Sequence, residues 1–323
     1  MSNERSPNYL IEKNKQLIVP VVLVIALCLL ALVCGPHIFT NNGIGSAIIV
    51  LSPMILAALA LTPIALVGRG GVDLSVGPLL GFINVSMVKW LVGNEITNPV
   101  AIVGYVIAAG VIYQLIVATI IIYVRVAPII VTLSGYLVLT GVNLVIMDRP
   151  SGVAPDWMQD WGSGTDILSP VFLIVAIMIV LWIVFSKTSL YQQILLTGAE
   201  ERMSFANGVN TVASRYGAHI VSGVFTGIAA LTYTALISSG DPTQGNTYTL
   251  AAITALVLGG TSLAGGKGGG FGSILGAVNI YLISYVLSTF SFGSVSGFVT
   301  QMSTGAILVI SLIINSFMNR RSA

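Results

Sequence analysis

Long stretches of uncharged, mostly apolar residues follow one another along almost the whole chain, and they constrain its fold more than any other feature. Only 7% of the 323 residues are Asp, Glu, Lys or Arg, against about 25% in an ordinary soluble domain. So few charged side chains do not cover a water-facing surface of this size. The apolar residues must therefore face lipid, which makes the chain an integral membrane protein.

Each of these stretches is long enough to cross a bilayer as a helix. A helix needs about 20 mostly apolar residues to span the hydrocarbon core, and it satisfies its own backbone there. We therefore expect an all-α fold, a polytopic bundle that forms one domain with about ten transmembrane helices. The third and eighth predicted spans are short and bordered by glycine clusters, which is typical of broken or re-entrant helices. The predicted spans are residues 17–34, 45–67, 74–93, 99–124, 127–147, 167–186, 214–238, 247–264, 271–290 and 298–317.

The positions of lysine and arginine predict the orientation of the chain, because short loops rich in basic residues remain cytoplasmic. With the N-terminus inside, ten spans leave only Lys89 and Arg149 of the 13 basic residues outside. We therefore expect a cytoplasmic N-terminal segment (1–16), a transmembrane domain (17–317) and a cytoplasmic tail (318–323). The predicted external loops are acidic instead and contain Glu95, Asp148, Asp156, Asp160, Asp166 and Asp241.

Several functional classes find no support in the composition. The net charge of +2 comes from few groups, without a basic patch, so we expect no nucleic-acid partner. Cys28 and Cys34 lie in or at the end of the first apolar run and are interpreted as packing residues. His37 and His219 have no carboxylate-rich neighbourhood in sequence, so no metal site or nucleophilic site is indicated. We expect a protein that is not an enzyme.

One long segment between the sixth and seventh spans is polar enough to leave the membrane. Within residues 188–213 the run from Leu196 to Gly208 predicts a short amphipathic helix, which Gly208 is placed to end. Its charged face consists of Glu200, Glu201 and Arg202, and Met203 and Phe205 supply apolar contacts. On the external side, residues 148–161 contain two tryptophans that suit either a docking surface or an anchor at the water interface.

Two glycine-dense segments border predicted spans, at Gly68–Gly77 and Gly259–Gly272. Neither is a nucleotide-binding loop, because a P-loop ends in Gly-Lys-Ser/Thr and Lys267 is followed by Gly268. Glycine allows positive φ angles and close approach between helix backbones. We therefore interpret both segments as joints and contact points between helices.

Asp73 is the most informative single residue, because a carboxylate beside a membrane span is costly unless it is paired, capped or hydrated. With Ser75 it is placed to cap the helix that begins near Leu74. Arg69, four residues earlier, offers a second means of compensation. The alternative to this structural role is direct contact with a substrate or a gate.

These segments carry a resemblance to a known family. The run Gly70-Gly-Val-Asp-Leu-Ser-Val-Gly77 resembles the Gly-Gly-Ile-Asp-Leu-Ser-Val-Gly signature of ribose-, xylose- and arabinose-type ABC permeases, and Gly259–Gly276 resembles the second signature of that family. Thr197–Gly208 falls where the family places its cytoplasmic coupling helix. Two departures stand out: the usual Gly-Gly-Asn-Glu-Ala-Ala is replaced by Thr197-Gly-Ala-Glu-Glu-Arg202, and Arg69 is an unusual charge.

The resemblance implies a type II ABC importer-like permease subunit in the bacterial inner membrane that carries a sugar inward. It implies as partners an ABC ATPase subunit that holds ATP and Mg²⁺, a second permease chain, identical or related, and a periplasmic substrate-binding protein. It assigns no catalytic residue, metal or cofactor to this chain. The residues it implies for coupling to the ATPase are Gly198, Glu200, Glu201, Arg202, Ser204, Phe205 and Gly208. Those it implies for the signatures and gating are Gly70, Gly71, Asp73, Ser75, Gly77, Gly259, Gly260, Thr261, Gly265, Gly266 and Gly272.

Other transporters remain as alternatives. ABC permeases for nucleosides or branched-chain amino acids share this general architecture. The run Asp73-Leu-Ser-Val-Gly77 favours sugars but does not indicate which sugar or sugar-like solute is carried. An ion-coupled secondary transporter would need intramembrane carboxylates, for which Asp73 is the only candidate. Several polar residues within spans are expected to join helices rather than bind solute: Gln114, Thr132, Ser134, Asn143, Thr234 and Ser238.

Overall fold

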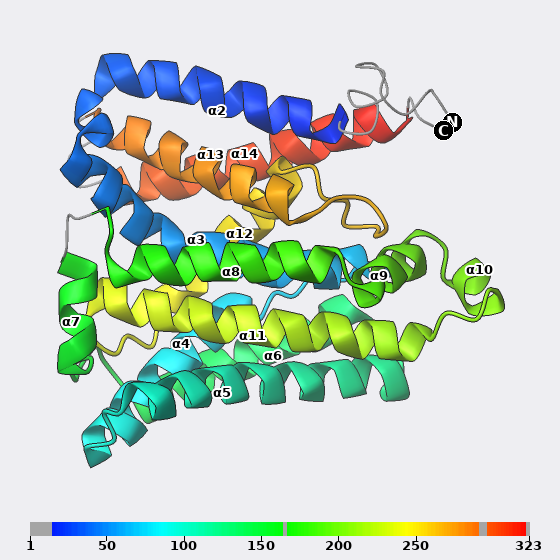
Figure 1. Cartoon of the computed structure of the whole chain (residues 1–323), viewed down its shortest axis with the longest axis horizontal. Helices are drawn as coiled ribbons and strands as arrows, with labels where there is room; N and C mark the ends of the chain where they lie inside the picture. Colours follow the sequence, from blue (N-terminus) through cyan, green and yellow to red (C-terminus); the bar gives the residue numbers. More distant parts are fainter. Residues whose placement is uncertain (1–14, 164–166, 291–295, 321–323) are drawn as a thin grey trace.

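The computed structural model describes residues 15–163, 167–290 and 296–320, which form a bundle of helices (Figure 1). Backbone pairing between strands within these ranges is limited to one isolated bridge, between Ser151 and Gly240. The predicted all-α class is therefore confirmed. The α-helices are α2 (Lys15–Cys34), α3 (Asn41–Leu66), α4 (Val76–Ser86), α5 (Pro99–Thr119), α6 (Pro128–Ile146), α7 (Asp156–Ser163), α8 (Pro170–Ser186), α9 (Ser189–Ala199), α10 (Glu201–Ala206), α11 (Thr211–Ile237), α12 (Thr247–Leu258), α13 (Gly270–Ser288) and α14 (Ser296–Arg320). Short 3-10 or π segments are η1 (Pro36–Phe39), η2 (Met87–Leu91), η3 (Val92–Asn94), η4 (Ile120–Val124) and η5 (Gln244–Asn246).

Local chemistry explains where several helices begin. The Thr40 hydroxyl accepts the amide of Gly43 at the start of α3, and the Ser169 hydroxyl accepts the amide of Phe172 at the start of α8. Such side chains satisfy amides that have no partner within the helix. Proline occupies the first position of α5, α6 and α8, where its missing N–H group costs nothing.

The centre of the bundle is formed by α3 and α11, whose side chains are buried along most of their length. α11 packs along α3 and α5. The crossing with α5 is especially close: a Cβ atom on Gly110 would lie 2.2 Å from the carbonyl oxygen of Gly223. One on Gly227 would lie 2.3 Å from the carbonyl oxygen of Val106. Small residues thus let two backbones touch, as is common between helices in membranes.

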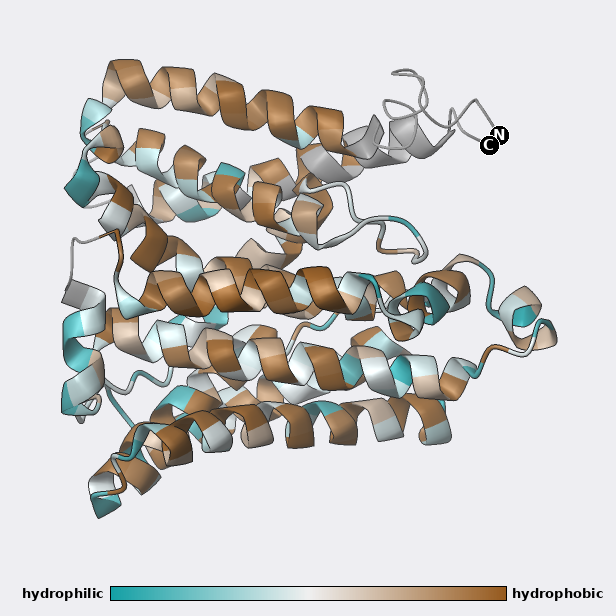
Figure 2. Ribbon diagram, in the orientation of Figure 1, coloured by the Kyte–Doolittle hydropathy of each residue, from teal (hydrophilic) through white to brown (hydrophobic). Residues whose placement is uncertain are grey.

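The periphery of the bundle is apolar as well. Aliphatic side chains such as Val100 on α5 and Val145 on α6 are more than four-fifths exposed in the isolated chain. Figure 2 shows hydrophobic residues along the lengths of the helices and hydrophilic residues gathered toward the two ends of the bundle. An apolar belt around helices that satisfy their own backbones is the arrangement that lipid requires.

The two ends of the bundle are distinguished by short helices. We call the end that carries α7 the α7 end, and the opposite end, which carries α9 and α10, the α10 end (Figure 1). α2 begins and α14 ends at the α10 end. Most of the predicted segment 1–16 lies outside the described residues, as do residues 321–323 of the predicted tail and Asp166.

The predicted count of ten spans is not confirmed. Within the described ranges, seven helices are long and apolar enough to cross a membrane, or eight if α8 and α9, bent by 70° at their break, count as one. The predicted span at 247–264 is interrupted, as its glycine cluster indicated: α12 has only 12 residues and ends before Gly259. A helix of that length rises about 18 Å, which is shorter than the hydrocarbon core. Gly260, with a φ of 82°, turns the chain away just after the helix ends.

Candidate functional site

Three segments that are distant in sequence meet at the α10 end: the loop after α3, the end of α9 and the loop between α12 and α13. The amide of Gly266 donates a hydrogen bond to the carbonyl oxygen of Leu66 over 2.9 Å. A Cβ atom on Gly198 would lie 1.8 Å from that same oxygen, and one on Gly265 would lie 2.5 Å from Cα of Gly68. Only glycine permits such contact. We call Gly68, Gly198, Gly265 and Gly266 the glycine junction.

The loop between α3 and α4, residues 67–75, carries the first signature. Gly68, Arg69 and Gly70 have φ angles of 87°, 58° and 67°. The left-handed region is unfavourable for a residue with a long side chain such as Arg69, so contacts elsewhere must hold it. One contact is from α6, where the Thr132 hydroxyl donates to the carbonyl oxygen of Val72 over 3.0 Å. The loop is therefore fixed by neighbours on more than one side.

Asp73 is fully buried in this loop. Its Oδ1 accepts the amide and the hydroxyl of Ser75 at 2.8 and 2.5 Å, and its Oδ2 accepts Nε2 of Gln114 on α5 at 2.5 Å. Arg69, a predicted counter-charge for Asp73, pairs with Glu201 instead. The amide that Asp73 accepts belongs to the residue before α4 and not to the helix itself. Three hydrogen bonds therefore compensate its burial and shape the turn into α4.

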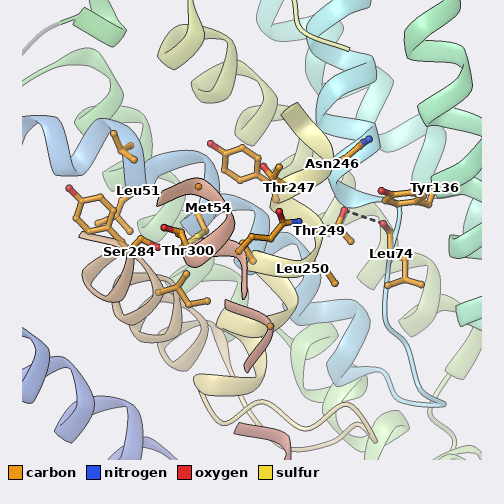
Figure 3. Close-up of a pocket in the computed structure, with 18 of the residues that line it drawn as sticks. Leu51, Met54, Leu74, Tyr136, Asn246, Thr247, Thr249, Leu250, Ser284 and Thr300 are labelled. Carbon is orange, nitrogen blue, oxygen red and sulfur yellow. Dashed lines mark hydrogen bonds between the residues drawn. The ribbon is translucent and has the colours of Figure 1, made fainter. Parts of the chain in front are cut away.

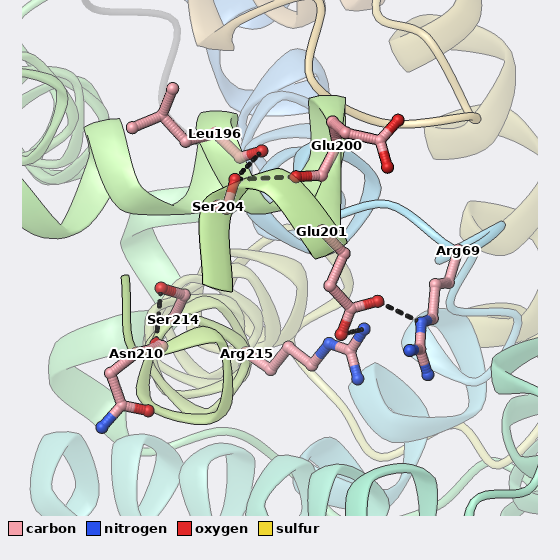
Figure 4. A network of polar contacts seen from close by, with 8 residues as sticks. All are labelled: Arg69, Leu196, Glu200, Glu201, Ser204, Asn210, Ser214 and Arg215. Atoms are coloured by element: carbon pink, nitrogen blue, oxygen red, sulfur yellow. Dashed lines mark hydrogen bonds and ion pairs between the residues drawn. The ribbon is translucent and has the colours of Figure 1, made fainter. Parts of the chain in front are cut away.

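Glu201, the first residue of α10, joins the predicted coupling helix to two other elements (Figure 4). Its Oε2 accepts Nε of Arg69 at 2.5 Å, and its Oε1 forms an ion pair with Nη2 of Arg215, near the start of α11, over 2.7 Å. The Arg215 side chain is 12% exposed and the Arg69 side chain 59% exposed. The pair with Arg215 is therefore the better shielded from water and salt.

A hydroxyl ties α10 back to α9. Ser204 is buried, and its Oγ donates to the carbonyl oxygens of Leu196 and Glu200 at 2.7 and 2.9 Å. Gly208, which was expected to end the helix, follows α10 by two residues and has a φ of 82°. The predicted short helix is therefore present as α10 only, over Glu201–Ala206. The start of the predicted run, from Leu196, belongs to α9, which the sequence did not indicate as a separate helix.

The other face of α10 is exposed. Glu200 and Arg202 are exposed, and the apolar Met203 and Phe205 are 64% and 72% exposed. Unlike the aliphatic side chains of the belt, these two lie on a short helix at the end of the bundle (Figure 1). Apolar side chains between charged neighbours are typical of a surface that contacts another protein.

The second signature is another close backbone contact. A Cβ atom on Gly259 or on Gly272 would lie 2.1 Å from the carbonyl oxygen of the other, so the end of α12 packs against the start of α13. Gly260 turns the chain at this point. Thr261 is buried, and its hydroxyl accepts the amide of Gly269 at 3.4 Å. These residues shape the loop that supplies Gly265 and Gly266 to the glycine junction.

The starts of α4 and α12 form a pair. The amide of Gly77, in the first turn of α4, donates to Oγ1 of Thr249 over 3.1 Å, and that hydroxyl donates to the carbonyl oxygen of Leu74 over 3.3 Å (dashed line in Figure 3). A Cβ atom on Gly77 would lie 2.3 Å from the hydroxyl oxygen. The two short helices thus touch where both begin.

A cavity of about 650 Å³ lies beside this pair (Figure 3). Val50 and Leu250 at its border are 45% and 52% exposed, so it opens on the side of the single chain. Among the described residues that line it, none is charged. Asn246 contributes a buried Oδ1 that accepts no hydrogen bond from the described residues. The other polar or aromatic groups in the lining are Tyr136, Thr247, Tyr248, Thr249, Tyr281, Ser284, Thr300 and Gln301.

Residues 43–314 match the protein family described as "Branched-chain amino acid transport system / permease component". The match includes the glycine junction, α10 and every residue that lines the cavity. The chain belongs to this permease family. Its membership agrees with the helical bundle and its apolar belt.

Curated relatives of this permease include the ribose import permease protein RbsC of Escherichia coli (strain K12), 27% identical over 91% of this chain and 92% of the relative. The autoinducer 2 import system permease protein LsrD of Photorhabdus luminescens is 27% identical over 80% of this chain and 78% of the relative. The D-allose transport system permease protein AlsC of Escherichia coli (strain K12) is 27% identical over 66% of each.

The polar residues within the permease spans behave mostly as expected, since none of the six lines the cavity. Gln114, Thr132 and Asn143 donate to other elements, and Thr234 accepts from Asn84 of α4. Ser134 and Ser238 do not join helices as expected. Their hydroxyls donate to carbonyl oxygens three or four residues earlier in the same helix, an alternative that serine side chains commonly use.

Sequence reasoning missed Arg215 and His219 as site residues. Both lie on α11, four residues apart and thus on one face. Arg215 pairs with Glu201, and His219 contacts Gln114. The available signal was an arginine and a histidine on the same face of a helix that is otherwise uncharged.

Proposed function

We propose that this chain is the membrane-spanning subunit of an ATP-driven importer that moves a neutral sugar or sugar-like solute into the cytoplasm. The observation that carries the proposal is the uncharged cavity of about 650 Å³ beside the paired starts of α4 and α12. Its volume falls in the range of small-molecule sites, about 300–1,000 Å³. Its hydroxyl, amide and aromatic groups suit a neutral solute that carries several hydroxyls.

The chemistry of the cavity favours a sugar over an amino acid. An amino acid carries an ammonium group and a carboxylate, and burying charges without partners costs several kcal/mol or more. The described lining offers neither a cation nor an anion. The hydroxyls of Tyr136, Thr247 and Thr300 in the lining instead suit the hydroxyls of a sugar, because each can donate or accept a hydrogen bond. The relatives named for ribose and D-allose import support the same class.

The energy source in this proposal is a separate ATPase subunit, which would bind ATP and Mg²⁺. The exposed face of α10, with Met203 and Phe205, would contact that subunit. A second permease chain, identical or related, would cover the open side of the cavity near Val50 and Leu250. A periplasmic substrate-binding protein would dock at the α7 end.

We further propose that the α10 end faces the cytoplasm of a bacterium and the α7 end the outside of its inner membrane. Because α2 begins and α14 ends at the α10 end, the chain crosses an even number of times between them (Figure 1). Basic residues follow the distribution expected for a cytoplasmic side. Those in loops or helix starts at the α10 end include Arg69, Arg125, Lys187, Arg202, Arg215 and Lys267.

Transport by the reconstituted complex tests the proposal. Proteoliposomes that contain this chain with its ATPase and binding protein are expected to accumulate radiolabelled D-ribose or D-allose only with ATP, and not to accumulate L-leucine. The chain alone is expected to accumulate none of them. Accumulation of L-leucine, or accumulation against a gradient by the chain alone, would contradict the proposal.

A further inference from the structure

A buried polar contact crosses the interior between the first-signature loop and α11. Gln114, on α5, is fully buried. Its Nε2 donates to Oδ2 of Asp73 over 2.5 Å, and its Oε1 lies 2.7 Å from Nδ1 of His219. Asp73 is also fully buried and His219 is 4% exposed. One glutamine side chain therefore bridges two polar groups from different elements.

Hydrogen-bond chemistry fixes the direction of this bridge. A carboxylate only accepts, so the amide nitrogen of Gln114 must face Asp73 and the amide oxygen must face His219. An amide oxygen also only accepts, so Nδ1 of His219 carries a hydrogen. Turning the Gln114 amide over would point its oxygen at the carboxylate of Asp73. Ionised Asp73 therefore selects this arrangement of the bridge.

The bridge belongs to a closed ring of contacts. His219 lies one helical turn after Arg215 on α11, and Arg215 pairs with Glu201 of α10. Glu201 also pairs with Arg69, in the same loop as Asp73. The loop is thus attached to α10 at Arg69 and, four residues later, to α5 and α11 at Asp73. A displacement of α10 acts on the loop at Arg69. The attachment at Asp73 then determines whether the end of the loop beside α4 moves with it.

The far end of the loop leads directly to the cavity. Asp73 lies three residues before α4, and Gly77 in the first turn of that helix contacts Thr249 of α12. Leu74 and Thr249 both line the cavity. We propose that Gln114 is a positioning residue that holds Asp73 to α11, so that movement of α10 reaches the starts of α4 and α12 at the cavity wall. This inference rests on the proposed function.

A matched pair of variants separates this role from a purely structural one. Gln114→Leu keeps a side chain of similar size and removes both hydrogen bonds. Asn279→Leu removes another fully buried amide, which donates to the carbonyl oxygen of Pro20 on α2 over 2.9 Å and lies outside the ring. A third variant, His219→Phe, removes the α11 contact and leaves the Gln114–Asp73 bond in place.

The readout is the distance between spin labels beside α10 and beside the start of α12 in the complete complex. Labels at Asn207→Cys and Gln244→Cys use exposed positions outside the cavity lining, in a background with Cys28→Ala and Cys34→Ala. Distances are compared without nucleotide and after trapping with ATP and vanadate. The same variants without labels give the number of D-ribose molecules imported per ATP hydrolysed.

We expect trapping with ATP and vanadate to change the label distance in the labelled protein without further substitution and in Asn279→Leu. The distance should stay unchanged in Gln114→Leu and His219→Phe. D-ribose imported per ATP should fall about tenfold in Gln114→Leu, since a hydrogen bond to a charged group is worth at least that factor. It should fall less in His219→Phe, which keeps the bond between Gln114 and Asp73. Equal distance changes in all variants, no change in any, or loss of assembly in Gln114→Leu and His219→Phe alone would overturn the proposal. Absence of sugar import by the unsubstituted complex would instead contradict the proposed function, while the label distances still test the bridge.

Discussion

At the scale of single residues, the α10 end concentrates charge in an otherwise nearly uncharged protein. Glu201 contacts two arginines of unequal exposure, and the glycine junction brings the first-signature loop beside it. Burial of a charge is tolerated when it is paired and costly when its partner is removed. The two ion pairs of Glu201 should therefore contribute different amounts to the free energy of unfolding.

Substitutions in this cluster test that difference. Glu201→Gln leaves the shielded Arg215 without a counter-charge and should lower the free energy of unfolding by about 2 kcal/mol. Arg69→Ala removes only the exposed partner and should cost less than about 1 kcal/mol. Unfolding of the detergent-solubilised protein in an SDS titration measures both.

Arg202→Gln serves as the control, because Arg202 is an exposed neighbour on the same short helix. Its effect should stay within about 0.5 kcal/mol. An Arg69→Ala effect equal to that of Glu201→Gln would show that exposure does not set the value of these pairs.

At the scale of elements, close backbone contacts stabilise the packing of the helices, as hydrophobic burial does in a soluble protein. Lipid tails are as apolar as aliphatic side chains, so association in a membrane depends on small residues that pack closely and on hydrogen bonds between helices. The α5–α11 crossing and the Gly259–Gly272 contact follow this rule. α10, with six residues, is too short to be stable alone and depends on Ser204 and Glu201 for its position.

Two glycines on α5 provide a direct comparison. Gly110→Ala would place Cβ 2.2 Å from the backbone of α11 and should destabilise the protein by about 1–3 kcal/mol. Gly104→Ala meets no atom within 4 Å and should be neutral or stabilise by up to about 1 kcal/mol through helix propensity. The SDS titration again supplies the measurement, and equal effects at the two positions would contradict the close-contact account.

At the scale of the whole molecule, the charged contacts and the cavity occupy different parts of the bundle. Charged contacts and an exposed apolar patch occupy the α10 end, while the uncharged cavity opens on the side (Figures 1 and 3). The first-signature loop and the short helices α4 and α12 lie between them. Such an arrangement is suited to transmitting movement from one end of the bundle to its interior.

The proposed orientation is testable by labelling in whole cells of a bacterial host. With Cys28 and Cys34 replaced, a cysteine at Val153, exposed near α7, should react with a membrane-impermeant maleimide applied from outside. A cysteine at Asn207, exposed beside α10, should react only after the inner membrane is opened. The reverse pattern would show that the α10 end faces outward.

The sequence by itself determined the solvent and the class of fold. Scarce charges and long apolar runs require lipid and helices, and the two signatures with the polar segment located the joints and the short helix of α10. The sequence predicts these features because each depends on the composition and periodicity of one short stretch of residues. The number of spans is not confirmed, and the predicted span at 247–264 is interrupted because glycines end α12 after Leu258.

Only the tertiary structure decided which joints meet and which charges pair. Arg69 lies four residues from Asp73 in sequence but pairs with Glu201, 132 residues away, because a left-handed turn directs its side chain toward α10. Gln114 and His219 are 105 residues apart in sequence, and the crossing of α5 and α11 brings them into contact. The physical reason is that both the cavity and the ring depend on the packing angles of several helices, which no single stretch of sequence encodes.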